Sequence, residues 1–388
     1  MKSYYFDNAA TSWPKPRCVL RTMRRFLMYG GGNPGRSGHG RSIDAGKIVL
    51  HTRTLLAQLF NVKDPSRIVF TKNATEALNI AILGTLSKGG HVITTSMEHN
   101  SVMRPLSFLK GHGVEVSVVS ADRTGRVEPS SLKKSIKSNT SLVIVTHASN
   151  VTGTINDIET IGRICSEKDV PFLVDAAQSA GVLPIDVEKM HIDLLAFSGH
   201  KGLLGPQGTG ALYIGPDVSA PEPLMMGGTG SISDREVQPE FMPDRYESGT
   251  LNVVGLAGLM EGVRYIMDTG IERVLRFDRN LLRIFLDEIA GDERFIIYGP
   301  GGKDQTGVLS LNIKGVSPSD LGELLETEYG IQTRVGLHCA PSAHRTIGSF
   351  PEGTVRFSWG IFTSEKDVLW VTRSLKKIAS RVRKAKDH

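Results

Sequence analysis

Short apolar runs alternate with helix-like segments along the chain as far as about residue 252. The runs are rich in Val, Ile and Leu, which is typical of strands buried on both faces of a mainly parallel sheet. The strands that we expect lie at residues 68–70, 91–95, 114–119, 142–147, 172–175, 193–197 and 210–214.

Helix-like segments lie between these runs, at residues 76–86, 129–138 and 158–168. Strands that alternate with helices predict an α/β domain. In such sheets ligands bind beyond the carboxyl ends of the strands. Polar residues that directly follow a strand are therefore candidates for a functional site.

The pattern changes after about residue 252, and it predicts a smaller domain with an antiparallel or mixed sheet. The elements expected there are helices at 253–268 and 271–290, strands at 308–313, 331–335 and 354–358, and helices that open at Ser317-Pro318 and Ser364-Glu365. We expect a large domain at 16–255 and a smaller α+β domain made of 1–15 and 256–388.

The composition of the 388 residues, with 40% hydrophobic and 22% charged, is that of an ordinary globular protein and excludes a disordered or fibrous chain. Three cysteines, Cys18, Cys165 and Cys339, are too few and too far apart for a disulfide framework. No apolar run approaches the roughly 18–20 residues that span a bilayer, and the N-terminal residues lack the apolar core of a secretory signal. We expect a cytoplasmic protein without membrane contact.

The net charge of +6 raises the question of nucleic-acid binding. The charges are spread thinly through helical stretches, and the only dense cluster lies at residues 376–386. We interpret that cluster as a solvated helix face and tail, and we expect no nucleic-acid partner. The positive balance could also help to attract anionic substrates or cofactors.

Two polar segments follow the first predicted strands. In the segment Thr71-Lys72-Asn73-Ala74-Thr75-Glu76 a strand turns into a helix, whose free N–H groups make a phosphate seat around Ala74 and Thr75. The same residues could equally be a simple helix cap. In Glu98-His99-Asn100, the flat ring of His99 would suit stacking on an aromatic cofactor, although a lone His is more often a structural hydrogen-bonding group.

Two further segments follow later strands. Asp175 ends an apolar strand, where a buried charge needs a cationic partner such as a protonated ring nitrogen, and Gln178 could face the same ligand. The alternative is that Asp175 caps the next helix. In Ser198-Gly199-His200-Lys201, the amine of Lys201 suits a Schiff base with a carbonyl, and Ser198 and His200 could hold a phosphate. The alternative is a surface turn.

The smaller domain contributes a thiol and two guanidinium groups. Cys339 lies in a loop that contains Gly and Pro, where the neighbouring His338, Arg334 and Arg345 could favour the nucleophilic thiolate. Arg356, on a short predicted strand, could clamp a carboxylate or form an ordinary ion pair.

Several common motifs are missing from the sequence. There is no Gly-x-x-x-x-Gly-Lys-Ser/Thr loop, and the glycines Gly30, Gly32 and Gly35 follow a helix-like stretch rather than a strand. His338, Cys339 and His344 match no common metal-ligand spacing, so we expect no metal site.

Together these residues resemble the class-V aminotransferase family of pyridoxal-phosphate (PLP) enzymes, and within it the cysteine desulfurase and selenocysteine lyase group. The likeness runs from Phe6-Asp7-Asn8-Ala9-Ala10-Thr11 almost to the C-terminus. It implies PLP-dependent transferase fold type I, in which a large domain with a mainly parallel seven-stranded sheet is joined to a smaller α+β domain that carries the catalytic cysteine loop.

The resemblance implies that Lys201 carries PLP, that Asp175 pairs with the pyridinium nitrogen, that Gln178 touches the phenolic oxygen and that His99 stacks on the ring and helps to move protons. The phosphate would be held by Ala74, Thr75, Ser198 and His200. In Glu247-Ser248-Gly249-Thr250, Thr250 would reach the phosphate of a neighbouring subunit, which implies a homodimer.

The resemblance also implies a substrate side, with Asn150 and Arg356 as the carboxylate-binding pair, Arg334 as a second arginine and Cys339 as the persulfide-forming thiol. The implied reaction converts L-cysteine to L-alanine, with the sulfur passed to Cys339 and then to an acceptor protein that the sequence does not identify. The short Arg-x-Gly-x-His-Cys loop is similar to the branch with a compact catalytic loop, although Leu337 stands where that branch often has a second His.

Three alternatives stay open. Selenium leaves a carbon more readily than sulfur does, so a selenocysteine lyase needs the thiol less strictly. If the protein is another class-V aminotransferase or a β-eliminating lyase, Cys339 takes no part in the reaction. A sulfur carrier that has lost catalysis is a further alternative, against which Lys201, Asp175 and Cys339 argue.

Overall fold

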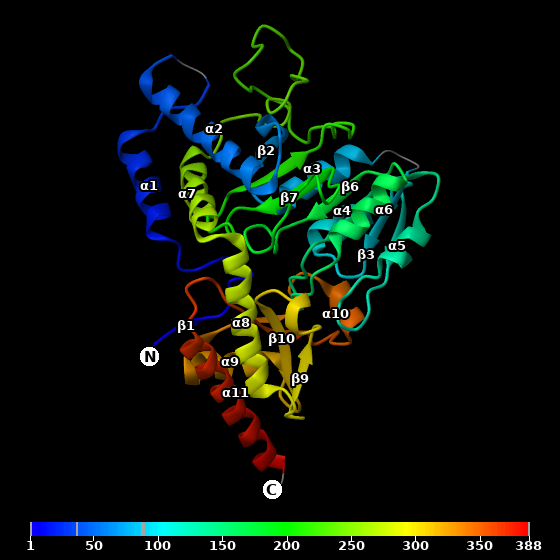
Figure 1. The fold of residues 1–388 in the computed structure, drawn as a ribbon, viewed down its shortest axis with the longest axis vertical. Coiled ribbons are helices and arrows are strands. Elements are labelled where there is room, and N and C mark those ends of the chain that lie inside the picture. The colour runs from blue at the N-terminus through cyan, green and yellow to red at the C-terminus, as the bar shows by residue number, and fades with distance from the viewer. Residues whose placement is uncertain (1, 36–37, 87–89, 387–388) are drawn as a thin grey trace.

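The computed structural model describes residues 2–35, 38–86 and 90–386, with side chains described as far as residue 381. The part of the predicted basic tail beyond residue 381 therefore lies outside the described side chains. A large sheet with helices on both faces forms one half of the molecule, and two smaller sheets form the other (Figure 1).

The large sheet has seven strands, as expected, in the order β2-β8-β7-β6-β5-β3-β4. All neighbours are parallel except β8, which runs antiparallel to β2 and β7. In chain order the strands are β2 (Ile68–Thr71), β3 (His91–Thr95), β4 (Glu115–Val119), β5 (Thr140–Thr146), β6 (Phe172–Asp175), β7 (Leu194–Ser198) and β8 (Gly210–Ile214).

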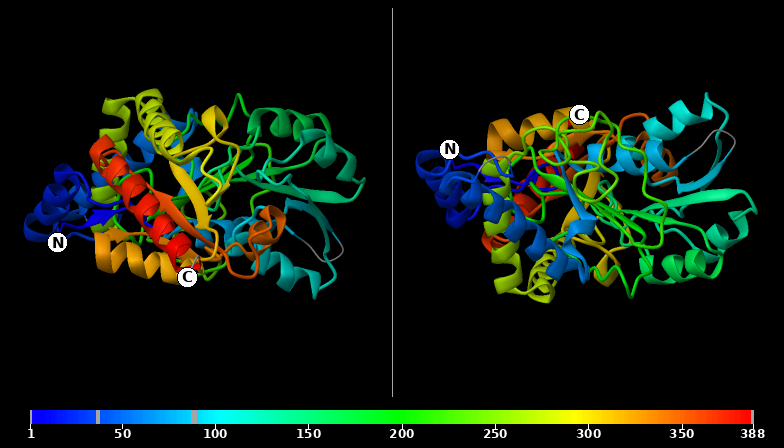
Figure 2. Two further views of the ribbon diagram at one scale, coloured as in Figure 1. Left: turned by 90° about the horizontal axis from the view of Figure 1, so that it is seen from below. Right: turned by 90° about the horizontal axis from the view of Figure 1, so that it is seen from above.

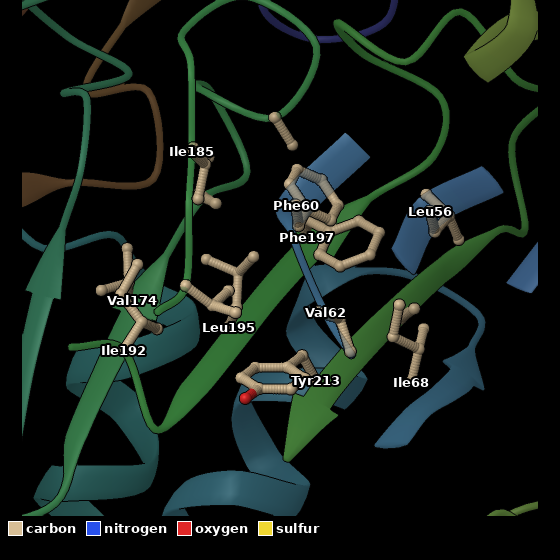
Figure 3. Packing of buried hydrophobic residues seen from close by; sticks show 14 of the residues in the cluster. Leu56, Phe60, Val62, Ile68, Val174, Ile185, Ile192, Leu195, Phe197 and Tyr213 are labelled. Carbon is tan, nitrogen blue, oxygen red and sulfur yellow. The ribbon is translucent and has the colours of Figure 1, made fainter. Parts of the chain in front are cut away.

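Apolar side chains on both faces of this sheet explain the uninterrupted apolar runs. On β7, Leu195 and Phe197 point into one core, whereas Leu194 and Ala196 point into the other. Figure 3 shows Phe197 beside Phe60, and their ring centroids are 4.9 Å apart. Truncating such a fully buried Phe typically costs about 3–5 kcal/mol of unfolding free energy.

Helices cover both cores. The first core contains residues of α1 (Arg17–Tyr29), α2 (Gly40–Phe60), α5 (Pro129–Ser135), α6 (Ile158–Glu167) and α7 (Val253–Thr269). The second contains residues of α3 (Ala74–Thr85) and α4 (Asn100–Lys110). The helices expected at 76–86, 129–138, 158–168 and 253–268 are confirmed, with ends that shift by at most three residues.

The smaller half has a four-stranded antiparallel sheet in the order β12-β13-β10-β9. Its strands are β9 (Phe295–Tyr298), β10 (Val308–Ile313), β12 (Arg334–Gly336) and β13 (Thr354–Ser358), and its helices are α8 (Ile271–Ile289), α9 (Pro318–Tyr329), α10 (Pro341–Ile347) and α11 (Glu365–Lys386). Seen from below in Figure 2, α11 lies beside α8 and α9, with which it shares a core.

One predicted strand was wrong. Residues 331–335 form two strands instead of one: β11 (Ile331–Gln332) pairs with β1 (Tyr4–Tyr5), whereas β12 pairs with β13. One polar residue, Thr333, lies between them, and the apolar pattern does not show that the chain changes partner there.

Several elements were not predicted, namely α2, α4, β1, β9 and α10. Each lacks a simple pattern: α4 contains Pro105 in its interior, β9 has only four residues of which one is buried, and α10 has only seven residues. The helix α2 is well capped by His39, whose ring accepts the Ser42 N–H, but apolar residues are spread around its circumference.

The N-terminal segment contacts both halves. Tyr4 pairs with Ile331 of β11, whereas the Ser12 N–H donates to the His200 carbonyl at 3.1 Å. The expected domain division at residues 16–255 stays a prediction. No helix formed by the described residues is long and apolar enough to cross a membrane.

Candidate active site

A cavity of about 320 Å³ lies beyond the carboxyl ends of β5, β6 and β7 and is closed by residues of the smaller half. Its lining includes all but one of the residues that the family resemblance implied for binding the cofactor or the substrate or for forming the persulfide. They are Ala74, Thr75, His99, Asn150, Asp175, Gln178, Ser198, His200, Lys201, Arg334, Cys339 and Arg356. The volume is in the range of pockets that hold small molecules.

The start of α3 forms a seat for an anion. Asn73 caps the helix by accepting the Glu76 N–H, and the Ala74 N–H donates to Ser198 Oγ at 3.0 Å. The Thr75 hydroxyl is hydrogen-bonded to Ser101 Oγ at 2.8 Å. Hydroxyl groups and helix N–H groups thus converge from three elements, an arrangement that favours a phosphate.

Close approach of β8 to this helix start requires a glycine. A Cβ at Gly210 would lie 2.7 Å from the Cα of Asn73, a distance that real Cβ atoms do not adopt. The absence of a side chain at Gly210 therefore allows the seat to lie directly against the sheet.

Asp175 is the last residue of β6 and is only 4% exposed. Burial raises the pKa of its carboxyl, and the Ala177 N–H and the charge of Lys201 oppose that rise. The Ala177 N–H donates to Asp175 Oδ1 at 2.9 Å, so this oxygen caps a turn and not a helix, since the described residues between β6 and β7 form no helix. A carboxylate buried this deeply is also suited to a cationic nitrogen of a ligand.

Lys201 lies three residues after the end of β7, and no carboxylate of the described residues forms an ion pair with it. Burial lowers the pKa of its amine to about 8, although the charge of Asp175 opposes the decrease. A substantial fraction of the amine is then neutral near pH 7 to 8, which is the form that attacks a carbonyl.

The N-terminal segment supports the loop before Lys201. The His200 carbonyl accepts hydrogen bonds from Thr11 Oγ1, Ser12 Oγ and Lys15 Nζ, and the Ser12 hydroxyl also donates to the Lys201 carbonyl. Burial and the charge of Lys201 lower the pKa of the His200 imidazole to about 4, so this ring is neutral at physiological pH.

His99 caps α4, and its ring also lines the cavity. Its Nδ1 accepts the Ser101 N–H at 3.1 Å, which places the proton of the neutral ring on Nε2. Burial, Lys201 and Arg356 lower the pKa of the ring to about 4. Ser101, which joins His99 to Thr75, was missed by the sequence analysis, although its position two residues after His99 is a usual place for a capping contact.

Glu98 was also missed as a chemical group. It is fully buried, and burial raises the pKa of its carboxyl to about 8, although hydrogen bonds from Thr95 and Thr146 oppose the shift. Its Oε1 accepts from Thr95 Oγ1 and from the Thr146 N–H, whereas its Oε2 has no partner among the described residues. Glu98 is therefore mainly neutral at pH 7 and braces the turn before His99.

The thiol side of the cavity is a turn that follows β12. His338 and Cys339 both have left-handed backbone angles, with φ of 49° and 56°. The Cys339 carbonyl accepts the Asn100 N–H at 2.8 Å, and the His338 carbonyl accepts from Asn150 Nδ2 at 2.8 Å. These bonds tie the turn to the large half and leave the thiol exposed toward the cavity.

Arg356 on β13 is buried and held by two oxygens. One of its terminal nitrogens donates to Asp7 Oδ1 at 2.6 Å and the other to the Asn150 carbonyl at 3.0 Å. Burial lowers the pKa of the guanidinium, and its Nε has no partner among the described residues. Asp7, which the sequence analysis did not single out for a role, is thus the resident partner of Arg356, whereas Arg334 is exposed at the rim.

Thr250 is the one predicted site residue that does not line this cavity. It lines a separate cavity with Glu247 and Ser248. Glu247 forms a buried two-bond ion pair with Arg53 of α2, at 2.8 Å for both bonds, and accepts the Phe70 N–H of β2. A single chain therefore does not bring Thr250 to Lys201.

No group of three or more His, Cys, Asp or Glu side chains within the described ranges is arranged to hold a metal ion. His338 and His344, which the sequence placed beside Cys339, are hydrogen-bonded to each other instead.

Comparisons with known proteins agree in fold and in family. The family model for class-V aminotransferases matches residues 4–371. A probable cysteine desulfurase of Methanothermobacter thermautotrophicus is 34% identical over 98% of this chain and 96% of its own, and one of Pyrococcus abyssi is 36% identical over 94% and 91%.

Two solved structures have the same fold. The apo cysteine desulfurase of Thermococcus onnurineus superposes with a TM-score of 0.91 at 34% identity, over 97% of this chain and 95% of its own. A cysteine desulfurase of Escherichia coli gives a TM-score of 0.85 at 29% identity, over 96% of this chain and 94% of its own.

Proposed function

This chain belongs to the class-V aminotransferase family, and we propose that it is a PLP-dependent cysteine desulfurase. The proposed reaction converts L-cysteine to L-alanine and leaves the sulfur as a persulfide on Cys339. The observation that carries the proposal is that Lys201 and Cys339, from different halves of the chain, line one cavity.

The residues around Lys201 fit the proposed cofactor. The start of α3 with Ser198 and Thr75 would hold its phosphate, Asp175 its protonated ring nitrogen and Lys201 its aldehyde carbon, while Gln178 and His99 would contact the ring. Support comes from the buried carboxyl of Asp175 and from the unpaired, partly neutral amine of Lys201. When bound, PLP withdraws electrons from the substrate and so makes its bonds at Cα and Cβ reactive.

Lys201 is our candidate for moving the proton at the substrate Cα, because the pKa of its amine lies near 8. The Nε2–H of His99 is a second candidate proton donor. Arg356, with Asn150 and Arg334, is the proposed site for the substrate carboxylate. Asp7 already binds one terminal nitrogen of Arg356, and Arg356 also lines the cavity, where a substrate carboxylate could engage its guanidinium group.

The sulfur step balances without an external oxidant. The Sγ of Cys339 attacks the sulfur of the substrate, the Cβ–S bond breaks, and a proton is added at Cβ to give alanine. The new S–S bond leaves a persulfide, whose outer sulfur must then pass to an acceptor. We propose that this acceptor is a protein or a thiol that reaches the exposed Cys339.

We further propose a homodimer in a reducing, cytoplasmic setting. The position of Thr250 outside the Lys201 cavity supports a role toward a second subunit. The segment before it exposes large apolar side chains that a partner could cover, namely Leu224, Met225, Met226, Val237 and Phe241. The three cysteines are free, which suits a reducing compartment.

The decisive experiment supplies the PLP-loaded protein with L-cysteine or with L-selenocysteine and measures alanine, pyruvate, sulfide and selenide together. We expect alanine and sulfur in equal amounts from cysteine in the presence of a reductant. The variant Cys339→Ala should bind PLP but lose at least about 100-fold in alanine formation from cysteine, because the sulfur then has no nucleophile.

Other results identify the alternatives. Unchanged turnover of cysteine by Cys339→Ala would refute the persulfide step. A selenocysteine lyase would be indicated by two results together: the wild-type protein prefers selenocysteine, and Cys339→Ala loses activity with cysteine but not with selenocysteine. Pyruvate in place of alanine would indicate β-elimination.

A further inference from the structure

A chain of three buried polar side chains lies behind the catalytic thiol. Ser349 Oγ is 2.7 Å from His344 Nδ1, and His344 Nε2 is 3.2 Å from His338 Nδ1. His338 Nε2 is 3.2 Å from the carbonyl of Arg334. His338 lines the cavity next to Cys339, whereas His344 is fully buried.

The Arg334 carbonyl at one end fixes which atom donates in each of these hydrogen bonds. A carbonyl can only accept, so His338 Nε2 carries a proton and donates it to Arg334 O. Neutral His338 then accepts at Nδ1 from His344 Nε2–H, and His344 accepts at Nδ1 from the Ser349 hydroxyl. Every ring nitrogen in this arrangement has one partner of the correct kind.

Both rings are held neutral. Burial lowers the pKa of His338 to about 2, with help from the charges of Arg356 and Arg334. Burial and Arg356 lower the pKa of His344 to about 4. A chain of neutral imidazoles is a poor acid or base at pH 7, but it fixes the orientation of each ring.

These hydrogen-bonded side chains orient His338, which shapes the turn that carries the Cys339 thiol. His338 and Cys339 have φ values of 49° and 56°, which non-glycine residues rarely adopt and which surrounding contacts must stabilise. The His338 ring is anchored by His344 on one side and by Arg334 O on the other, while its carbonyl binds Asn150. Behind it, α10 packs through Ala343 and Ile347 against the large half.

We propose that His344, supported by Ser349, is a positioning residue that holds His338 and therefore directs the Cys339 thiol toward the substrate sulfur. This role rests on the proposed desulfurase function. It differs from acid–base catalysis by the His residues, because neither His344 nor Ser349 lines the cavity of the described residues. It also supplies the turn with a polar anchor, which the apolar side chain of Leu337 cannot provide.

The test uses two substitutions of one residue. His344→Leu fills much of the space without hydrogen bonds, whereas His344→Gln keeps one donor and one acceptor. In single-turnover reactions of the PLP-loaded protein with cysteine, we expect His344→Leu to form the Cys339 persulfide roughly 10- to 100-fold more slowly, because a misplaced nucleophile loses about that much. The KM for cysteine and the absorbance of the bound cofactor should stay unchanged, and His344→Gln should recover most of the rate.

A second measurement does not need the reaction. Amide hydrogen exchange over residues 334–345 should accelerate about 10-fold or more in His344→Leu and stay near wild type in His344→Gln. Substitution of the exposed His112 by Leu is the matched control and should change neither readout.

The outcomes separate this proposal from the proposed function. Wild-type persulfide rates in His344→Leu, or equal losses in His344→Leu and His344→Gln, would overturn the positioning role. If the wild-type protein forms no persulfide from cysteine, the desulfurase function fails. The exchange data would then decide whether His344 orders the turn, and unchanged exchange in His344→Leu would overturn that as well.

Discussion

The two walls of the cavity are built in different ways. The Lys201 wall consists of the ends of regular strands and the start of a helix, where Thr75, Asp175 and Ser198 each follow or end an apolar run. The Cys339 wall is a turn whose backbone is left-handed at two successive residues and whose shape depends on contacts from three other segments.

This difference has a physical consequence. Side chains on the Lys201 wall are placed by a sheet that is buried on both faces, so their positions depend on packing in two large cores. The position of the thiol depends on a few hydrogen bonds, from Asn100, Asn150 and His344. The first wall should therefore tolerate changes in hydrogen bonding better than the second, whereas loss of its chemical groups should be more damaging.

The largest effect is expected for Lys201→Ala. Without the amine, the Lys201 wall loses both the proposed anchor of the cofactor aldehyde and the group that moves the proton at the substrate Cα. We expect a loss of alanine formation on the order of 10⁴-fold, the upper end for a positioned proton-transfer group. The visible absorbance of the PLP-loaded protein should also shift, while Lys189→Ala, in an exposed pair with Glu159, should keep that absorbance.

Asp175→Asn should be the next most damaging change. The substitution keeps the shape and removes the charge that the proposed ring cation needs, and we expect a loss of roughly 10²- to 10³-fold in kcat. Asp193→Asn, at the opposite end of the same pair of strands, is a matched control that alters a carboxylate bound to the Phe172 N–H. An equal loss in both variants would mean that Asp175 acts through the fold and not through its charge.

Arg356→Lys tests the contact between the walls. Lysine keeps the positive charge but cannot bind Asp7 and the Asn150 carbonyl with two directed N–H groups. We expect KM for cysteine to rise roughly 10- to 100-fold, with a smaller change in kcat. Arg294→Lys, in a surface pair with Asp292, should leave both constants unchanged. A fall in kcat alone would place the substrate carboxylate elsewhere.

The sequence predicted the Lys201 wall far better than the Cys339 wall. Buried strands give an apolar pattern, and the residue after such a run must lie at the functional edge, so Asp175 and Lys201 could be located without coordinates. The seven strands and the helices α3, α5, α6 and α7 followed from the same pattern, whereas α2 and α4 did not. The family resemblance located Cys339, but no local pattern predicts that His344 meets His338 or that Asp7 meets Arg356, because these contacts depend on tertiary packing.

The partner change within residues 331–335 has the same cause. The apolar pattern indicates that these residues are extended, but it does not indicate which strand they pair with. Thr250 shows a further limit, since its predicted role belongs to an assembly and the single chain places it in another cavity.

The smallest expected effect is on the pH dependence of the free energy of unfolding. Its sign should differ between a buried group near the Lys201 wall and one near the Cys339 wall. Glu98 on the Lys201 wall has a pKa raised from 4.5 to about 8, so the folded protein keeps a proton that the unfolded chain releases above pH 4.5. Stability is therefore lost as pH rises from about 5 to 8, by about 1.4 kcal/mol per pH unit at most. Glu98→Gln stays neutral, and its stability relative to wild type should increase over this range.

On the Cys339 wall the sign is opposite. The pKa of His344 is lowered from 6.5 to about 4, so the unfolded chain binds a proton there that the folded protein excludes, and stability is lost as pH falls from about 6.5 toward 4. The stability of His344→Gln relative to wild type should then rise as pH falls. Urea unfolding of the wild type and both variants at pH 5, 6, 7 and 8 measures the two trends. Parallel trends in the two variants would contradict the contrast between a wall with a protonated carboxyl and a wall with neutral imidazoles.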